Sequence, residues 1–118
     1  GSATATVSLR RDDHETVIEA AVGSGPVEAA CTALERITGI ELSLQHYDVR
    51  GVSIGEDAQG EVTITVGFNG AAYRGHGIST DIVEASVHAW LEVTNRIVRR
   101  REKGLADLTA NDTHHATI

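Results

Sequence analysis

The segment GHGISTDIVEASVHAWLE, residues 75–92, has a near copy earlier in the chain, GSGPVEAACTALE, residues 23–35. Each begins with Gly-x-Gly and continues with a Val-Glu-Ala triplet followed by a small residue. Apolar residues then recur every three or four positions, which is typical of an amphipathic helix. Two such segments about half a chain apart indicate an internal duplication. The sequence therefore predicts an α+β fold built from two similar units, each with a helix that follows a glycine loop.

Alternating apolar residues predict strands before each helix. In the first half, residues 3–10 alternate, a polar turn is expected at 11–14, and a second strand follows. The residues expected on the inner faces of these two strands are Ala5, Val7, Leu9, Ile18, Ala20 and Val22. In the second half, residues 62–68 alternate most clearly, and Asn69-Gly70 is a strong hairpin signal. The apolar face of 62–68 needs cover, which a second copy of the chain is expected to provide.

The strand that starts near residue 40 changes phase, from Leu44 to Tyr47 and Val49. A phase change inside a strand predicts a β-bulge near Gln45-His46. The helix ends are also marked in the sequence. Pro26 suits the first position of a helix and Gly39 suits its C-terminal end.

In the second unit, Ser79 or Thr80 is expected to cap the helix, with Asp81 in its first turn. The Arg99–Arg101 run is expected in the last turn of that helix, where cations meet the negative end of the helix dipole. Residues 104–118 are polar and aperiodic, so they are predicted to form a poorly ordered tail after a domain at 3–103.

The chain has 118 residues, which suits one domain, and a net charge of −7. An acidic chain repels phosphate backbones, so nucleic acid is an unlikely partner. One cysteine, Cys31, excludes an internal disulfide and a thiolate metal cluster, favours a cytoplasmic setting, and is expected in the core. No apolar run approaches the roughly 20 residues of a membrane span. Gly1-Ser2 resembles the remnant of an expression tag.

The two Gly-x-Gly segments suggest a ligand class. Free N–H groups at helix N-termini bind anions, including the carboxylate of an amino acid. Glycines that only supply tight turns with positive φ explain the same pattern without any ligand. No nucleophile has an evident base partner, so catalysis by this chain has no support, and no cofactor or metal is indicated.

The strings GxGxSxDIxxAS (75–86), GSGPVEA (23–29) and LQHYDV (44–49) resemble the C-terminal regulatory (dimerisation) domain of α-isopropylmalate synthase. Citramalate synthase carries a similar domain. The resemblance implies two pseudo-symmetric βββα-type repeats forming a two-layer sheet-and-helix domain, although the first repeat shows only two strands here. It also implies a homodimer that binds leucine between the repeats and thereby inhibits a separate catalytic barrel. That barrel is an acyltransferase that condenses acetyl-CoA with 2-oxoisovalerate.

The same resemblance implies the effector-binding residues, which are Gly23, Gly25, Pro26, Val27, Leu44, Tyr47, Gly51, Ala58, Gly75, Gly77, Ser79, Asp81 and Ile82. Gly51 stands where the family commonly has a slightly larger residue, which leaves leucine and isoleucine open as effectors. The alternatives are therefore an isoleucine-sensing domain of a citramalate synthase and a dimerisation module that senses nothing.

Overall fold

The computed structural model describes residues 2–10 and 15–117, with the backbone alone for residue 54 and residues 105–117. The predicted turn at 11–14 lies outside the described residues. The elements, in chain order, are β1 (Ala3–Arg10), β2 (Thr16–Gly23), α1 (Pro26–Thr38), β3 (Ser43–Ile54), β4 (Asp57–Phe68), β5 (Ala71–Ser79) and α2 (Ile82–Thr117). Strands β1 and β2 form an antiparallel pair, and β3, β4 and β5 form an antiparallel sheet in that order. The predicted α+β class is confirmed.

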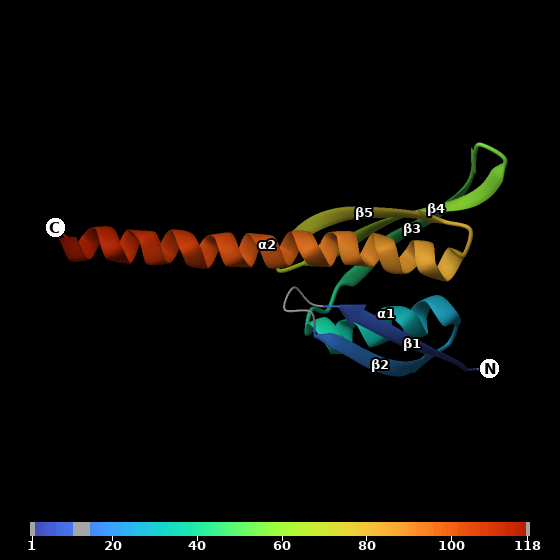
Figure 1. The fold of residues 1–118 in the computed structure, drawn as a ribbon, viewed down its shortest axis with the longest axis horizontal. Coiled ribbons are helices and arrows are strands. Elements are labelled where there is room, and N and C mark those ends of the chain that lie inside the picture. The colour runs from blue at the N-terminus through green and yellow to red at the C-terminus, as the bar shows by residue number, and fades with distance from the viewer. Residues whose placement is uncertain (1, 11–14, 118) are drawn as a thin grey trace.

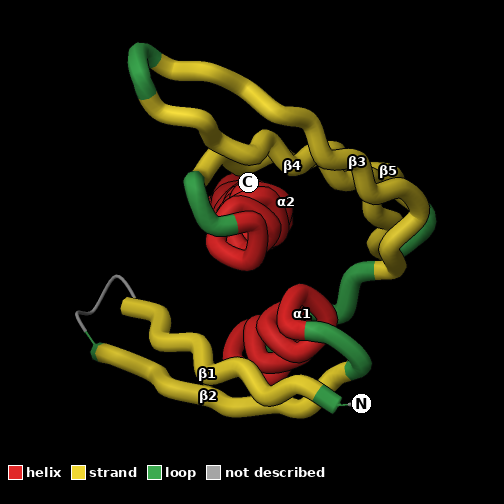
Figure 2. Tube along the Cα trace, turned by 90° about the vertical axis from the view of Figure 1, so that its right-hand side faces the viewer, coloured by secondary structure: helices red, strands yellow, loops and turns green. Residues whose placement is uncertain are grey.

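The two sheets lie on opposite sides of a layer of helices. Helix α1 packs on β1 and β2, helix α2 packs on β4 and β5, and the two helices face each other between the sheets (Figure 2). Both helices begin at the same end of the molecule (Figure 1). Each repeat is therefore a sheet-and-helix unit, ββα in the first half and βββα in the second.

The two repeats match through their helices rather than through their glycines. Helix α1 begins at Pro26 and α2 at Ile82, so the Val-Glu-Ala triplets occupy the same helical turn. The expected second glycine loop is wrong, because Gly75 and Gly77 lie inside β5. A Cβ atom on Gly77 would stand 2.2 Å from the carbonyl oxygen of Ala85 in α2. These glycines are therefore required by the close approach of α2 to the sheet, not by a turn.

The predicted inner face of β2 is also wrong. Ile18 and Val22 are 65% and 61% exposed, whereas Ala21 is buried against the core beside half-buried Val17. In β1 the expected face is correct, with Val7 buried and Leu9 packed against the core. Strand β2 has apolar residues on both faces, so alternation alone did not indicate which face meets α1.

Several local predictions are confirmed. The β3–β4 register shifts between Leu44 and His46, which is the expected bulge. Asn69 and Gly70 both have positive φ, 50° and 77°, as a tight hairpin turn requires. Pro26 is the first residue of α1, and Gly39 closes that helix in the left-handed conformation, with its N–H donating to the Glu35 carbonyl.

The start of α2 differs from the expectation. Asp81 precedes the helix and caps it, because its Oδ1 accepts from the N–H groups of Val83 and Glu84 at 2.8 and 3.4 Å. Ser79, the last residue of β5, assists, because its Oγ accepts a hydrogen bond from the Asp81 N–H. Asp81 is therefore the N-cap rather than a residue of the first turn.

The other end of α2 also differs. Its backbone continues through residues 104–117, so Arg99–Arg101 do not lie in its last turn. The guanidinium groups of Arg100 and Arg101 instead lie over the rings of Tyr73 and Phe68, at 5.7 and 5.1 Å from the ring centres. These cation–π contacts hold the two arginine side chains of α2 against β5 and β4.

Candidate functional site

A groove of about 490 Å³ lies where the two repeats meet. Helix α1 supplies one wall, β3 supplies the opposite wall, and α2 contributes Trp90. The complete lining is Val27, Glu28, Cys31, Thr32, Glu35, Leu44, Tyr47 and Trp90. Its volume falls within the range of small-molecule sites.

The groove exists because α2 does not cover β3. Val62 and Ile64 on β4 are fully buried beneath α2, but Leu44 and Val49 on β3 are 50% and 45% exposed. After the bulge, Tyr47 pairs with Ile64 and therefore points to the same side of the sheet as the buried residues of β4. An apolar strip of β3 is thus left open toward α1.

Tyr47 links this strip to α2. Its hydroxyl lies 2.7 Å from Ser86 Oγ, and Ser86 Oγ lies 2.7 Å from the carbonyl oxygen of Ile82. A carbonyl oxygen only accepts hydrogen bonds, so the single O–H of Ser86 donates to Ile82. Tyr47 must therefore be the donor in its hydrogen bond with Ser86. The Tyr47 oxygen keeps its capacity to accept a hydrogen bond from a ligand.

The α1 wall is apolar at its centre and acidic at its edge. Burial, assisted by the charge of Glu35, raises the pKa of the Cys31 thiol to about 12, so this thiol stays protonated and unreactive. Burial also raises the pKa of Glu35, as does the charge of Glu41, against a backbone hydrogen bond from Leu42 that lowers it. Glu28 accepts a hydrogen bond from Ser24 at the start of α1. The groove therefore combines an aliphatic lining with carboxylates suited to a ligand ammonium group.

Trp90 presents an unpaired donor. The residue is 6% exposed and lines the groove, and its Nε1 is buried without a hydrogen-bond partner. A buried N–H left without a partner costs about 1–3 kcal/mol.

The structure brings together three of the predicted effector residues, Val27, Leu44 and Tyr47, as lining of the groove. Gly23, Gly25 and Pro26 lie at the start of α1, next to Val27. Gly51 and Ala58 lie further along the β3–β4 hairpin, paired with Gly60 and Ser53.

The remaining predicted residues belong to β5 and the start of α2. Gly75 and Gly77 lie under α2, Ser79 and Asp81 serve the helix cap, and Ile82 is 37% exposed at the first turn. Five further lining residues were not predicted from the sequence, namely Glu28, Cys31, Thr32, Glu35 and Trp90. The apolar residues that recur every three or four positions predict both helices, but this spacing does not indicate where the two helices meet.

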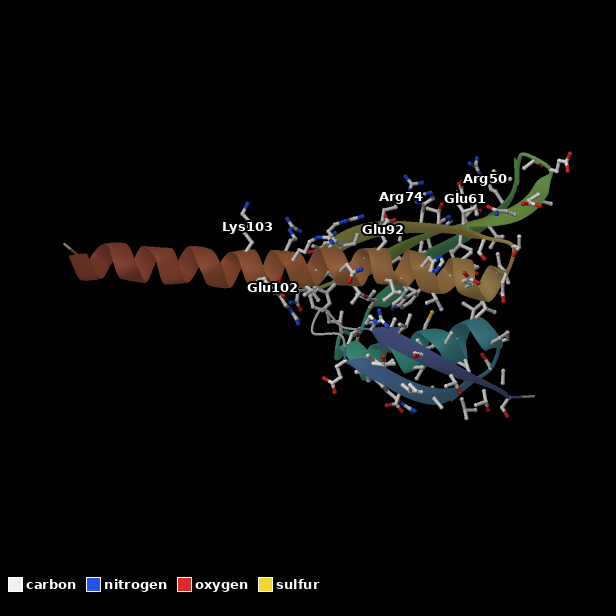
Figure 3. All side chains as sticks on the ribbon, in the orientation of Figure 1. Arg50, Glu61, Arg74, Glu92, Glu102 and Lys103 are labelled. Atoms are coloured by element: carbon white, nitrogen blue, oxygen red, sulfur yellow. The ribbon has the colours of Figure 1, made fainter. Side chains whose placement is uncertain are left out.

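The outer face of the three-stranded sheet has a different character. Arg50, Glu61 and Arg74 project from it away from α2 (Figure 3), and Arg50 and Glu61 form an ion pair of 3.2 Å. His76 on β5 lies 3.8 Å from Glu92 of α2. Among the residues whose side chains are described, no three His, Cys, Asp or Glu gather around a possible metal position. The described helices include none that is apolar and long enough to span a membrane.

Comparison with known proteins identifies the relatives of this chain. It is 50% identical over 95 residues to a 2-isopropylmalate synthase of Ruminiclostridium cellulolyticum, a match that covers 80% of this chain and 18% of that protein. It is 48% identical over 103 residues to the 2-isopropylmalate synthase of Xanthomonas campestris pv. campestris strain B100, covering 87% of this chain and 20% of that protein. The chain thus spans about a fifth of these relatives. The model of the LeuA allosteric (dimerisation) domain matches residues 1–98, and the chain belongs to that family.

Proposed function

We propose that this domain binds leucine in the groove between its repeats and thereby inhibits the synthase activity of the larger protein to which it belongs. The observation that carries the proposal is the groove itself, which has an aliphatic lining, two carboxylates and a tyrosine hydroxyl. A branched aliphatic side chain suits Val27 and Leu44, and an ammonium group suits Glu28 and Glu35. The relatives are 2-isopropylmalate synthases, and leucine is the effector that the resemblance implies for this family.

The position of the groove supports a regulatory role. One wall belongs to the first repeat and the other to the second, so a bound amino acid contacts both. A ligand that contacts both repeats favours the arrangement in which its contacts are complete, and this preference is what inhibition at a distance requires. This chain supplies the sensing domain, and the acyltransferase chemistry belongs to the catalytic barrel.

We further propose that the homodimer, which the family description supports, forms through the outer face of the β1–β2 pair. The apolar face of 62–68 was expected to be covered by a second copy, but its residues Val62, Ile64 and Val66 are already fully buried in the single chain, where α2 packs on β4. The outer face of β1–β2 carries one charged residue among eight, in the set Thr4, Thr6, Ser8, Arg10, Thr16, Ile18, Ala20 and Val22.

Charge favours this face over the other sheet. The chain carries a net charge of −7, so two copies repel each other, and contact between uncharged surfaces limits that cost. A twofold dimer also brings the same patch of each copy together, which the apolar and hydroxyl side chains of this face allow. The outer face of β3–β5, with Asp48, Arg50, Glu61 and Arg74, suits solvent better.

Thermal melts with L-leucine, L-isoleucine and the other amino acids test the sensing function. At a ligand concentration one hundred times the dissociation constant, binding to the folded state adds about 2.7 kcal/mol of stability. For a domain of this size the midpoint then rises on the order of 10 °C. A larger rise with isoleucine would assign the domain to a citramalate synthase, and unchanged melts with all twenty amino acids would contradict sensing.

A further inference from the structure

We propose that Trp90 is a ligand-binding residue, whose indole N–H donates a hydrogen bond to the carboxylate of the amino acid in the groove. This inference rests on the proposed sensing function and adds to it the orientation of the ligand. Its basis is the buried, unpartnered Nε1 of a residue that lines the groove. The nitrogen itself is closed to solvent in the unliganded chain, so the indole must turn toward the groove to reach an acceptor, and an amino acid offers one acceptor group, its carboxylate.

The charges of the groove exclude the opposite orientation. Both carboxylates of the lining, Glu28 and Glu35, are on α1. They attract the ammonium group of the ligand and repel its carboxylate. The ligand carboxylate is therefore directed to the wall away from α1, which is formed by β3 and by Trp90 of α2.

The N-termini of the two helices, which are the other anion-binding groups of the fold, already have a carboxylate. At α2, the Asp81 side chain accepts from two of the first N–H groups. At α1, Gly25 offers no capping side chain, but Ser24 holds the carboxylate of Glu28 in the first turn. A second carboxylate at either end would meet a like charge, whereas the environment of the indole N–H contains no such group among the lining residues of α2 and β3.

The wild-type protein provides a direct measurement, because Trp90 is its single tryptophan and gives one indole ¹H–¹⁵N signal. We expect L-leucine and 4-methylpentanoate, which both carry the carboxylate, to move this signal in the same direction. We expect 3-methylbutylamine, which lacks the carboxylate, to leave it in place at saturation. An unmoved signal with bound leucine, or an equal shift with the amine, would overturn the inference.

A variant tests the energetic contribution. Trp90→Phe keeps an aromatic ring but removes the N–H, and hydrogen bonds to charged groups contribute enough to predict about 10- to 100-fold weaker leucine binding. The affinity for 3-methylbutylamine should change little. Tyr73→Phe, a ring change outside the groove, is the matched control and should leave the leucine affinity unchanged.

The two proposals fail differently. If calorimetry detects no leucine binding to the wild-type chain, the sensing function is contradicted. If leucine binds with the same affinity to wild type and Trp90→Phe, only the role of the indole is contradicted.

Discussion

Tyr47 on β3 donates a hydrogen bond to Ser86 on α2 across 2.7 Å, although neither helix otherwise lies along β3 in the described part of the chain. Ser86 is 1% exposed, and its hydroxyl donates a hydrogen bond to the carbonyl oxygen of Ile82. The bond therefore joins the open wall of the groove to the first turns of α2. A ligand that moves the Tyr47 ring acts directly on the start of that helix.

Tyr47→Phe should lower the free energy of unfolding by about 0.5–1.5 kcal/mol, because it removes this hydrogen bond and leaves Ser86 its bond to Ile82. Denaturant unfolding measures the change. Tyr73→Phe is the control, since the Tyr73 hydroxyl bonds to exposed Arg100 and its loss should cost less. Equal costs for the two variants would contradict the structural role of the Tyr47–Ser86 bond.

The sequence predicted the elements well and their neighbours poorly. Pro26, Gly39, the bulge and the Asn69-Gly70 turn are local signals, in which each residue determines its own backbone conformation, and the structure confirms them. The Gly-x-Gly motif at 75–77 has the same letters as the one at 23–25 but another place in the fold, inside β5 rather than at the junction of β2 and α1. It permits close packing on α2, a tertiary contact that no local pattern reveals.

The candidate site was predictable only in part for the same reason. Tyr47 and Leu44 came from a resemblance, whereas Cys31 was expected only in the core and no sequence pattern marked Trp90 as a lining residue. Their place in the groove depends on how α1 packs against α2 and on how far α2 leaves β3 uncovered. Both depend on the arrangement of the repeats, which helix periodicity does not determine.

Gly77→Ala should destabilise the fold strongly, by about 3 kcal/mol, because the added Cβ would lie 2.2 Å from the Ala85 carbonyl oxygen and 2.8 Å from His88 Cβ. Gly51→Ala is the matched control, because a Cβ there meets nothing within 4 Å. Chemical denaturation of both variants tests the difference. A Gly77→Ala variant as stable as Gly51→Ala would refute the close packing of β5 against α2.

Glu35→Gln should stabilise the domain at pH 7. The folded-state pKa of Glu35 is raised above its ordinary value of 4.5, so the folded chain binds this proton more tightly than the unfolded chain. Stability therefore falls as pH rises from about 4.5 through the folded-state pKa, and it stays lower above that value. The variant lacks this loss, so its advantage over wild type should be present at pH 7 and shrink below pH 4.5.

Unfolding measurements at both pH values check this prediction. Glu102→Gln, on the exposed surface of α2, corrects for the loss of one negative charge from an acidic chain. If the two variants show the same pH dependence of stability, the burial of Glu35 does not cause the difference between Glu35→Gln and wild type.

Ile18→Glu should convert the dimer to a monomer with little effect on the fold. Ile18 is 65% exposed in the single chain, so the substitution removes few internal contacts, but a twofold interface would gain two carboxylates in an apolar setting. Light scattering should then report a mass near 12.5 kDa. His46→Glu, on the outer face of the other sheet, adds similar charge and should leave the dimer intact. A dimer that tolerates Ile18→Glu but dissociates with His46→Glu would assign the interface to β3–β5.

Gly51→Leu should prevent leucine binding while leaving the unliganded fold intact. Tyr47, Val49 and Gly51 follow the bulge without a further register shift, so they share the face of β3 that is open toward the groove. Gly51 has neither a positive φ nor a neighbour within 4 Å of an added Cβ, which removes the usual structural reasons for a glycine. A leucine side chain at this position would occupy the open strip beside Val49, and we expect it to block an effector that reaches past Tyr47 along β3. Calorimetric titration and a melt of the unliganded variant measure the two effects separately. Lost binding with an unchanged melt supports an effector site that reaches Gly51. Retained binding would exclude Gly51 from the site and confine the effector to the groove between Tyr47 and α1.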